Sequence, residues 1–258
     1  MEYGLIGEKL GHSYSKIIHE KIGGYHYGLN PLAKDNFDAF MKSRDFKGIN
    51  VTIPYKKDVI PYLDEIDEIA AKIGAVNTIV NKNGKLKGYN TDFYGLLYTV
   101  DHNYIKIEGK KVLVLGNGGA AKAVIALLQH LKAKDIILVG RTAKDGAITY
   151  EECYQSHSDG QVIVNTTPLG MYPELDAAAV DLKAFPSCEA ALDLIYNPLR
   201  TKLLLQAESL GIQAVNGLEM LVAQAVYAAE KYLDKKIDES IIEEIYNDIL
   251  MEFMKKET

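Results

Sequence analysis

The second half of the chain carries the most regular pattern of hydrophobic and polar positions. Residues 112–115 (VLVL) form a short apolar run with two β-branched residues, which is typical of a strand buried on both faces. Similar runs recur at 136–139, 162–164, 191–194 and 213–215, and helical segments are predicted at 120–131, 201–210 and 217–232. Strands that alternate with helices predict a doubly wound α/β domain, which we place at residues 101–234. Residues 142–160 carry no clear period.

Residues 1–100 mix short strands with helices and are expected to form a separate α/β domain. Strands are predicted at 3–6, 25–29, 48–54, 76–81 and 85–89, and helices from Lys16 onward, at 36–41, at 63–73 and at 93–103. Ser15 is the expected cap of the first of these helices. The pair Asn83-Gly84, between the last two strands, is typical of a two-residue hairpin turn. A last amphipathic helix at 239–254 is expected to return to this domain, so that residues 235–258 complete it.

A glycine-rich turn, Gly116-Asn117-Gly118-Gly119, joins the strand at 112–115 to the helix that begins near Ala120. Glycine has no Cβ, so the backbone can turn sharply there and a ligand can approach it closely. The helix N-terminus offers N–H groups and a partial positive charge to a pyrophosphate. Strand, glycine turn and helix together predict a dinucleotide site. The alternative is a turn of purely structural use.

The next predicted strand ends in Gly140-Arg141-Thr142. Sites specific for NAD place an acid near this position to bond the ribose 2′-hydroxyl, whereas an arginine suits a 2′-phosphate through its paired N–H donors. Lys144 is expected to assist. This residue type favours NADP, and an exposed basic loop is the alternative.

Composition limits the partners and the cellular location expected for this protein. The 258 residues include 48% hydrophobic residues and carry a formal net charge of -6, with no basic block that would suit nucleic acid. The two cysteines, Cys153 and Cys188, have neither a disulfide framework nor metal-ligand spacing. We recognise no signal peptide and no apolar run of spanning length, so we expect a cytoplasmic protein with no nucleic-acid or membrane partner and no metal.

Several further motifs occur in order between residues 12 and 224. They are His12-Ser13-Tyr14-Ser15, NVTIPYK at 50–56, GAVNT at 74–78, GYNTD at 88–92, NTTPLGM at 165–171, DLIYNPLRT at 193–201 and GLEMLVAQ at 217–224. Together with the glycine turn, they resemble the motifs of the shikimate dehydrogenases. The resemblance implies an N-terminal α/β substrate domain, a Rossmann-like NADP-binding domain, and an active site in the cleft between them.

The resemblance implies the reversible NADP-linked interconversion of 3-dehydroshikimate and shikimate. Oxidation of a secondary alcohol needs a group that takes the hydroxyl proton while hydride leaves, and reduction needs the same group to return it. The family's motif assigns this role to Lys56, with Asp92 as its partner. On the residues alone, the alternative is a surface lysine and a helix-capping aspartate.

The resemblance also assigns the substrate contacts. Ser13 and Ser15 would bind the substrate carboxylate through their hydroxyls, and the ring hydroxyls would meet amide and hydroxyl side chains. The residues implied for the ring are Thr52, Asn77 and Gln224, with Tyr196 lining the site. Without the motifs, Ser13 and Ser15 would be interpreted as turn and cap serines, and Thr52 as an ordinary strand residue. Asn77 would be a polar residue at a strand start, Gln224 a solvent-facing helix residue, and Tyr196 a packing aromatic.

The cofactor residues implied by the motifs cluster at the ends of the predicted parallel strands. They are Gly116, Asn117, Gly118, Gly119, Ala120, Arg141, Thr142, Lys144 and Thr166, with Leu194, Gly217 and Met220 beside the nicotinamide. Nucleotides bind at the carboxyl edge of such sheets. For the last three residues, ordinary apolar packing is the alternative.

This chain departs from the family's pattern at three positions. Lys16 stands where the family has proline, Phe93 where it has glycine, and Gly140 where it has asparagine. None of these departures removes an expected catalytic residue.

Competing hypotheses are a quinate/shikimate dehydrogenase that uses NAD or NADP, a methyltransferase, and a catalytically silent nucleotide-binding regulator. A methyltransferase would want an acid after the second strand, where 140–142 offers none, and the presence of both Lys56 and Asp92 argues against the regulator. A monomer or homodimer is expected.

Overall fold

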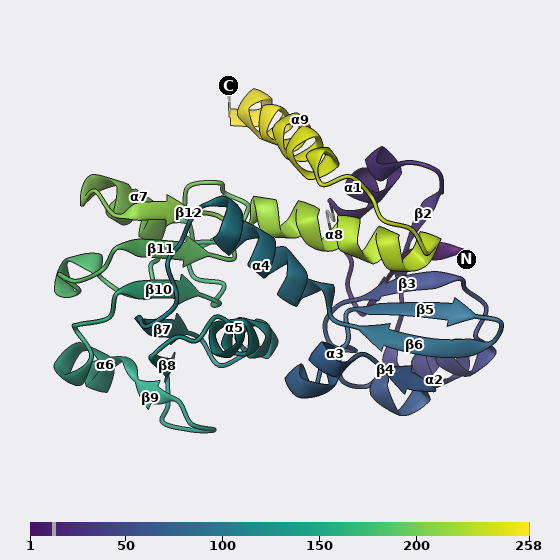
Figure 1. Ribbon diagram of the computed structural model, residues 1–258, viewed down its shortest axis with the longest axis horizontal. Coiled ribbons are helices and arrows are strands. Elements are labelled where there is room, and N and C mark those ends of the chain that lie inside the picture. The colour runs from purple at the N-terminus through teal and green to yellow at the C-terminus, as the bar shows by residue number, and fades with distance from the viewer. Residues whose placement is uncertain (12–13, 258) are drawn as a thin grey trace. The chain divides into compact units, whose positions relative to one another are not determined.

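The computed structural model describes residues 1–11 and 14–257 and divides into two compact units (Figure 1). The first unit comprises Met1–Gly95 and Leu221–Thr258, and the second comprises Leu96–Met220. The chain passes from one unit to the other inside helix α4 (Thr91–His102) and inside helix α8 (Leu218–Leu233).

These boundaries differ from the expected ones at residues 100 and 234, mainly because α8 lies largely in the first unit. Ala228 and Tyr232 of α8 are buried in one apolar cluster with Leu5, Tyr27 and Val80 from the sheet of that unit. Burial of this helix face ties residues 221–233 to the first unit, although they follow the strands of the second in sequence.

The first unit is built on a mixed six-stranded sheet of order β2-β1-β3-β5-β6-β4. Its strands are β1 (Tyr3–Gly7), β2 (Tyr27–Pro31), β3 (Gly48–Val51), β4 (Glu65–Ile66), β5 (Thr78–Lys82) and β6 (Lys85–Tyr89). The pairs formed by β1 with β2 and β3 are parallel, and β5 is antiparallel to both β3 and β6. Asn83 and Gly84 have φ of 54° and 85°, so the predicted hairpin turn is confirmed.

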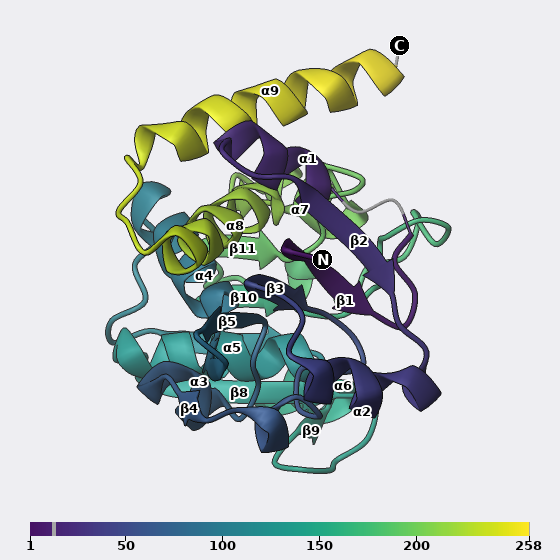
Figure 2. The same ribbon diagram turned by 90° about the vertical axis from the view of Figure 1, so that its right-hand side faces the viewer.

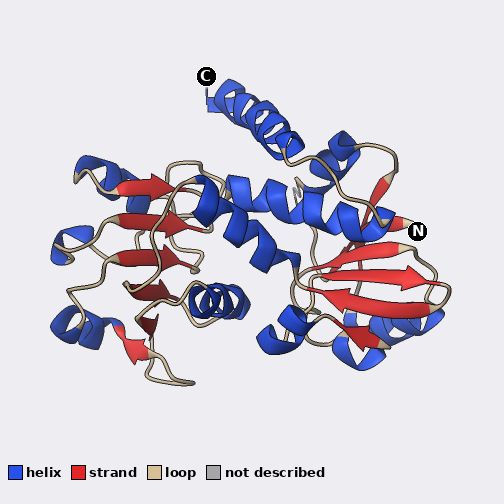
Figure 3. Cartoon of the chain, viewed as in Figure 1, coloured by secondary structure: helices blue, strands red, loops and turns tan. Residues whose placement is uncertain are grey.

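The helices of this unit include the predicted C-terminal one, which ends at the point marked C in Figure 3. Besides the parts of α4 and α8 that belong to this unit, they are α1 (Ser15–Ile22), α2 (Lys34–Ser43), η1 (Ile60–Tyr62), α3 (Glu68–Ile73) and α9 (Ser240–Glu257). Helix α9 runs beside α1, where Lys21 Nζ lies 2.6 Å from Asp248 Oδ2 and the rings of Tyr14 and Phe253 stack at 5.0 Å (Figure 2). The predicted return of the terminal helix to the first domain is therefore confirmed.

Two local predictions in this unit are wrong. The expected helix at 63–73 begins only at Glu68, because Asp67 caps it by accepting from the Ile69 N–H at 3.0 Å and residues 65–66 pair with β6 instead. Ser15 is the first residue of α1 and not its cap, since the cap position is held by Tyr14, which contributes no side-chain hydrogen bond to the helix.

The second unit is built on a parallel sheet, as the alternating pattern predicts. Its six strands have the order β12-β11-β10-β7-β8-β9, and β9 was not predicted. Its strands are β7 (Lys111–Leu115), β8 (Asp135–Gly140), β9 (Ile148–Thr149), β10 (Val162–Asn165), β11 (Ala190–Asp193) and β12 (Gln213–Val215). Its helices include α5 (Gly119–His130), α6 (Tyr150–Ser156) and α7 (Lys202–Ser209). A short 3-10 helix, η2 (Leu182–Ala184), precedes β11. Residues 142–160, for which the sequence shows no period, contain β9 and α6.

The sheet of the second unit is buried on both faces. Leu113 and Leu115 of β7 pack in one cluster with Cys153 of α6 and Leu203 of α7. Successive strand residues point to opposite faces, so Val112 and Val114 face the other side, and both are fully buried. This two-sided burial explains why β7 reads as a continuous apolar run. Among the described helices, none is long and apolar enough to cross a bilayer.

Candidate active site

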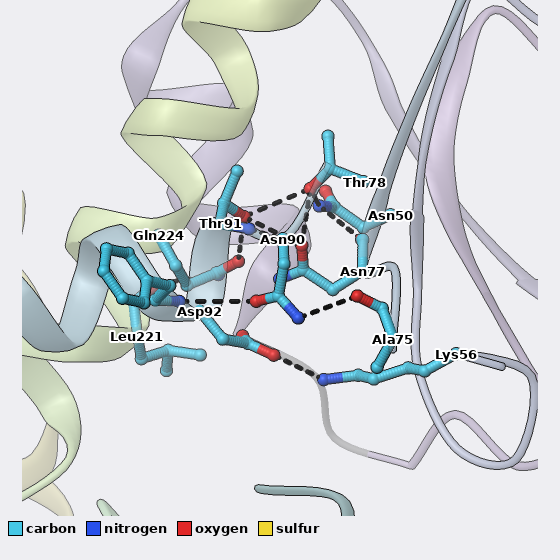
Figure 4. A network of polar contacts seen from close by, with 11 residues as sticks. Asn50, Lys56, Ala75, Asn77, Thr78, Asn90, Thr91, Asp92, Leu221 and Gln224 are labelled. Carbon is cyan, nitrogen blue, oxygen red and sulfur yellow. Dashed lines mark hydrogen bonds and ion pairs between the residues drawn. The ribbon is translucent and has the colours of Figure 1, made fainter. Parts of the chain in front are cut away.

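Lys56 and Asp92 form an ion pair in the first unit (Figure 4). Lys56 follows β3, and its Nζ donates to Asp92 Oδ2 in the first turn of α4 at 2.6 Å. The two side chains are 30% and 19% exposed, so the pair is partly screened from water and yet open to a small ligand. This arrangement places an ammonium group and a carboxylate where they can exchange a proton with a bound molecule.

The structure rules out the capping alternative for Asp92. The cap of α4 is Asn90, whose Oδ1 accepts from the Phe93 N–H at 3.3 Å, while its Nδ2 donates to the Ala75 carbonyl at 3.0 Å. Asn90 is 1% exposed. Because Asn90 closes the end of the helix, the Asp92 carboxylate is left to bind Lys56.

Asn77 lies beside this pair at the start of β5. The Val76 N–H donates to the Lys56 carbonyl at 2.7 Å, which ties the two backbone segments together. Asn77 Oδ1 accepts from the Thr91 N–H at 2.7 Å, from Thr78 Oγ1 at 3.0 Å and from Thr91 Oγ1 at 3.2 Å. Its side chain is therefore held firmly, and the residue is only 3% exposed.

Gln224 and Thr52 belong to the same unit. Gln224, on α8, is buried and not solvent-facing; its Nε2 donates to the Leu221 carbonyl at 2.9 Å, and its Oε1 accepts from Thr91 Oγ1 at 3.4 Å. Thr52 is partly exposed, and its N–H donates to the Ile6 carbonyl at 2.9 Å. The structure thus brings Gln224, Asn77 and the Lys56–Asp92 pair into one polar cluster (Figure 4).

The expected carboxylate serines are only partly described. Ser13 lies outside the described residues, as does His12. Ser15 opens α1, whose first turn contains no acidic residue. A helix N-terminus of this composition favours an anion over a cation.

The glycine turn of the second unit has the geometry of a nucleotide-binding loop. Gly116 has φ of 97°, and a Cβ there would meet Thr166 Oγ1 at 2.8 Å, so this position requires glycine. Cβ atoms built on Gly118 and Gly119 would meet nothing within 4 Å, so the backbone at the N-terminus of α5 is open to a ligand. Gly118 holds the cap position of this helix without a side-chain bond, which leaves N–H groups for a phosphate.

The remaining residues expected at the cofactor surround this loop or follow neighbouring strands. Thr166 follows β10 and donates to the Leu115 carbonyl at 2.7 Å. Arg141, Thr142 and Lys144 follow β8 and are exposed, as are Asn117 and Ala120. Cationic and hydroxyl side chains beside an open helix N-terminus fit a dinucleotide that carries an additional phosphate.

A second group of residues expected at the ligand sites follows strands β11 and β12. The backbone at Gly217 approaches Leu194 so closely that a Cβ would lie 2.2 Å from the Leu194 carbonyl oxygen, and the Gly217 N–H donates to the Ile195 carbonyl at 3.0 Å. Leu194, Tyr196 and Met220 are partly exposed. Gly217 is therefore a close-approach position, which the strand-and-helix pattern does not reveal.

Asp193 at the end of β11 is a polar residue whose role the sequence analysis did not address. It is 1% exposed, and it accepts from Thr201 Oγ1 at 2.7 Å, Asn165 Nδ2 at 3.0 Å and the Ile195 N–H at 3.1 Å. Burial raises its pKa from 3.8 to about 6. A lone acid that ends an otherwise apolar strand is the signal that would have identified it.

The sequence analysis also missed the side chains that support Asn77. Asn50, Thr78 and Thr91 are all buried and are hydrogen-bonded to one another or to Asn77. Asn50 interrupts the apolar strand 48–51, and this interruption is the available signal. Among residues 1–11 and 14–257, no group of three His, Cys, Asp or Glu side chains is arranged to hold a metal.

Comparison with known proteins relates both units to one family. Residues 5–79 match the family model of the shikimate dehydrogenase substrate binding domain. The chain is 42% identical over 269 residues to the shikimate dehydrogenase (NADP(+)) of Clostridium perfringens, with 97% of this chain and 99% of the relative covered. It is 38% identical over 255 residues to the enzyme of the same name from Halothermothrix orenii, with 87% and 88% covered.

Solved structures agree over nearly the whole chain. A chorismate mutase/shikimate 5-dehydrogenase fusion protein from Clostridium acetobutylicum superposes with a TM-score of 0.91 at 40% identity, covering 98% of each chain. Shikimate 5-dehydrogenase from Thermus thermophilus, solved in complex with NADP(H) and shikimate, superposes with a TM-score of 0.84 at 28% identity, covering 96% of this chain and 99% of that one.

Proposed function

Because this chain belongs to the shikimate dehydrogenase family, we propose that Lys56 and Asp92 carry the proton transfer in the NADP-linked interconversion of 3-dehydroshikimate and shikimate. The overall activity is that of an oxidoreductase acting on a secondary alcohol of a small carboxylated ring. The observation that carries the assignment of these two residues is their 2.6 Å ion pair.

The reduction places a hydride on the ketone carbon and a proton on its oxygen. When bound, NADPH supplies the hydride. The Lys56 ammonium group has three N–H donors, of which one is directed at Asp92, so others are available to the substrate oxygen. Asp92 keeps the ammonium group in place, and the partial exposure of both side chains lets water restore the proton after each turnover.

The second unit fits NADP. The open backbone at Gly118 and Gly119 supports a pyrophosphate at the N-terminus of α5. Arg141, with Thr142 and Lys144, supports binding of the 2′-phosphate. Thr166, Leu194, Gly217 and Met220 complete the proposed cofactor set.

The substrate is proposed to bind the first unit, with Tyr196 of the second unit as an additional contact. Asn77, Gln224 and Thr52 offer amide and hydroxyl groups to the ring hydroxyls. Ser13 and Ser15 offer hydroxyls to the carboxylate, and the absence of an acid from the first turn of α1 supports an anion there.

Substitution Lys56→Ala tests the proton-transfer role. We expect kcat to fall by about 10²–10⁴-fold, the range typical of a lost general acid, with the Kd for NADPH changed less than about twofold. Lys57→Ala removes the exposed neighbouring lysine and is the matched control, with kcat unchanged. Equal losses of turnover and of cofactor affinity in Lys56→Ala would contradict the role.

Substitution Arg141→Ala tests the cofactor assignment. The loss of charge-assisted hydrogen bonds to the 2′-phosphate is expected to raise the KM for NADPH by about 10–100-fold and to leave the KM for NADH unchanged. Lys134→Ala, at an exposed lysine of the same unit, is the control. Steady-state assays of both cofactors with shikimate and with quinate separate this enzyme from one that accepts quinate and NAD.

A further inference from the structure

The side-chain oxygen of Asn77 is saturated with donors. It accepts from the Thr91 N–H at 2.7 Å and from the Thr78 hydroxyl at 3.0 Å, and the Thr91 hydroxyl shares its single proton between this oxygen at 3.2 Å and Gln224 Oε1 at 3.4 Å. A backbone N–H can only donate, so the oxygen of the Asn77 amide, and not its nitrogen, must face Thr91. Among the described residues, no group accepts from Asn77 Nδ2. Asn77 therefore presents only N–H donors to a ligand.

The Thr78 hydroxyl donates to Asn77 because Asn50 already donates to the Thr78 oxygen. Asn50 Nδ2 donates to Thr78 Oγ1 at 3.0 Å and to the Asn77 carbonyl at 3.2 Å. Because a backbone carbonyl can only accept, the nitrogen of the Asn50 amide must face this side. Thr78 Oγ1 accepts a hydrogen bond from Asn50 Nδ2 and donates its own proton to Asn77 Oδ1 in a second bond.

Two buried phenols hold the other end of Asn50. Its Oδ1 accepts from the Tyr27 hydroxyl at 2.6 Å and from the Tyr232 hydroxyl at 2.8 Å. Burial raises the pKa of both tyrosines well above 10.0, so both remain protonated donors. Hydrogen bonds therefore run in one direction from the two phenols through Asn50 and Thr78 to Asn77.

This polar chain joins parts of the first unit that are distant in sequence. Tyr27 lies on β2, Asn50 on β3, Thr78 on β5 and Tyr232 on α8. Figure 1 labels these elements, and Figure 4 shows Asn50 and Thr78 beside Asn77. Asn50, Asn77 and Thr78 are all buried, at 6%, 3% and 0% exposed, and Asn50 and Thr78 both hydrogen-bond to Asn77. An effect of either residue on a ligand held by the Asn77 side chain passes through these bonds.

We infer that Asn50 and Thr78 are positioning residues that, together with the Thr91 N–H, hold the Asn77 amide so that the site selects an oxygen acting as hydrogen-bond acceptor on the substrate. The inference rests on the proposed function, because it takes Asn77 to contact shikimate. Loss of the Thr78 hydroxyl leaves the bond from the Thr91 N–H but removes a second anchor of the amide, so its N–H donors are held less well against the substrate oxygen and binding weakens.

A double-mutant cycle between Thr78 and Asn77 tests this inference. Thr78→Val removes the hydroxyl at nearly constant volume, and we expect a rise of about tenfold in the KM for shikimate with the KM for NADP within twofold. Thr78→Ser retains the hydroxyl and should stay within about threefold of the parent enzyme. In an Asn77→Ala background, Thr78→Val should change the KM for shikimate by less than twofold, because the amide on which it acts is gone.

Either of two outcomes would overturn the inference. One is an equal effect of Thr78→Val on the KM in both backgrounds, and the other is a serine variant as impaired as the valine variant. Asn77→Asp adds a test of polarity, since it exchanges the N–H donors for an acceptor at the same size. An Asn77→Asp enzyme with an unchanged KM for shikimate would likewise overturn it.

If Thr78→Val does not fold, a different variant tests the same inference. The double substitution Tyr27→Phe/Tyr232→Phe leaves Asn50 Oδ1 without donors, and we expect it to raise the KM for shikimate several-fold. Tyr62→Phe, which removes a phenol bond to Asp38 in the same unit, is the control and should leave the KM unchanged. If the parent enzyme does not oxidise shikimate at all, the proposed function fails; if it does and the cycle is additive, only the positioning role fails.

Discussion

Single polar residues within apolar strands organise hydrogen bonds in the interior of both units. Asn50 in β3 and Asp193 at the end of β11 are both almost fully buried, and both have hydrogen-bond partners on several sides. An unpaired polar group in such a position would cost free energy, so the partners are a requirement of the fold and not an accident. The same bonds determine which atoms each side chain offers to its neighbours.

Asp193 makes stability depend on pH in a predictable direction. Burial raises its pKa from 3.8 to about 6, so the folded state binds this proton more tightly than the unfolded state does. The stabilisation is full below about pH 4 and is lost as the pH rises through 6, a change of about 3 kcal/mol. Asp193→Asn cannot titrate, so its free energy of unfolding relative to the parent enzyme should rise between pH 4.5 and 7.5 in urea titrations. Asp176→Asn, at an exposed site, is the control, and parallel pH profiles of parent and Asp193→Asn would contradict the assignment.

Helices and strands follow the hydrophobic pattern closely, and their ends follow local polar chemistry. The strand β7 and the helix α5 lie within one residue of their predicted ranges, because burial on regular faces leaves a strong period. The start of α3 was missed because Asp67 caps the helix and the preceding pair joins the sheet. The start of α4 depends in the same way on Asn90, which also orients the first turn that carries Asp92.

Two side-chain helix caps in the first unit, Asn90 and Asp67, allow effects on stability to be separated from effects on catalysis. Asn90→Ala and Asp67→Ala each remove a side-chain cap, and each is expected to lower the free energy of unfolding by about 1 kcal/mol. Only Asn90 lies next to the helix turn that holds Asp92, so only Asn90→Ala should also lower kcat. Chemical denaturation with steady-state assays of both variants measures this. A fall in kcat for Asp67→Ala of the same size would contradict the positional argument.

At the scale of the whole molecule, the first unit is discontinuous in sequence. Residues 221–258 return to residues 1–95, and Tyr232 of α8 donates to Asn50 of β3 across 182 positions of the chain. The apolar cluster that contains Ala228 and Tyr232 makes this return part of the core of the unit. Unfolding of the C-terminal helices is therefore expected to affect the substrate side of the enzyme first.

Substitutions in the two cores should act on separate units. Ile249 of α9 is fully buried, so Ile249→Ala is expected to cost about 2–5 kcal/mol and to lower the hydrogen-exchange protection of β1, β2 and β3. Leu203→Ala, at a buried position of α7, is the reciprocal control and should lower the protection of β10 and β11. Protection lost equally in both units by either variant would show that the two units unfold together.

The sequence by itself determined the α/β class, the parallel sheet, the glycine turn, the terminal helix and the family. These features depend on hydrophobic periodicity, on glycine at strained backbone positions and on short motifs, all of which are local in the chain. It named Lys56, Asp92, Asn77 and Gln224 through motifs, without showing how they meet.

Tertiary structure alone decided which polar groups face one another. The boundary inside α8, the capping of α4 by Asn90 and the bonds from Tyr27 and Tyr232 to Asn50 all join residues that are remote or ambiguous in sequence. Hydrogen bonds depend on distance and direction within a few tenths of an ångström, and a linear pattern of residue types does not carry that information.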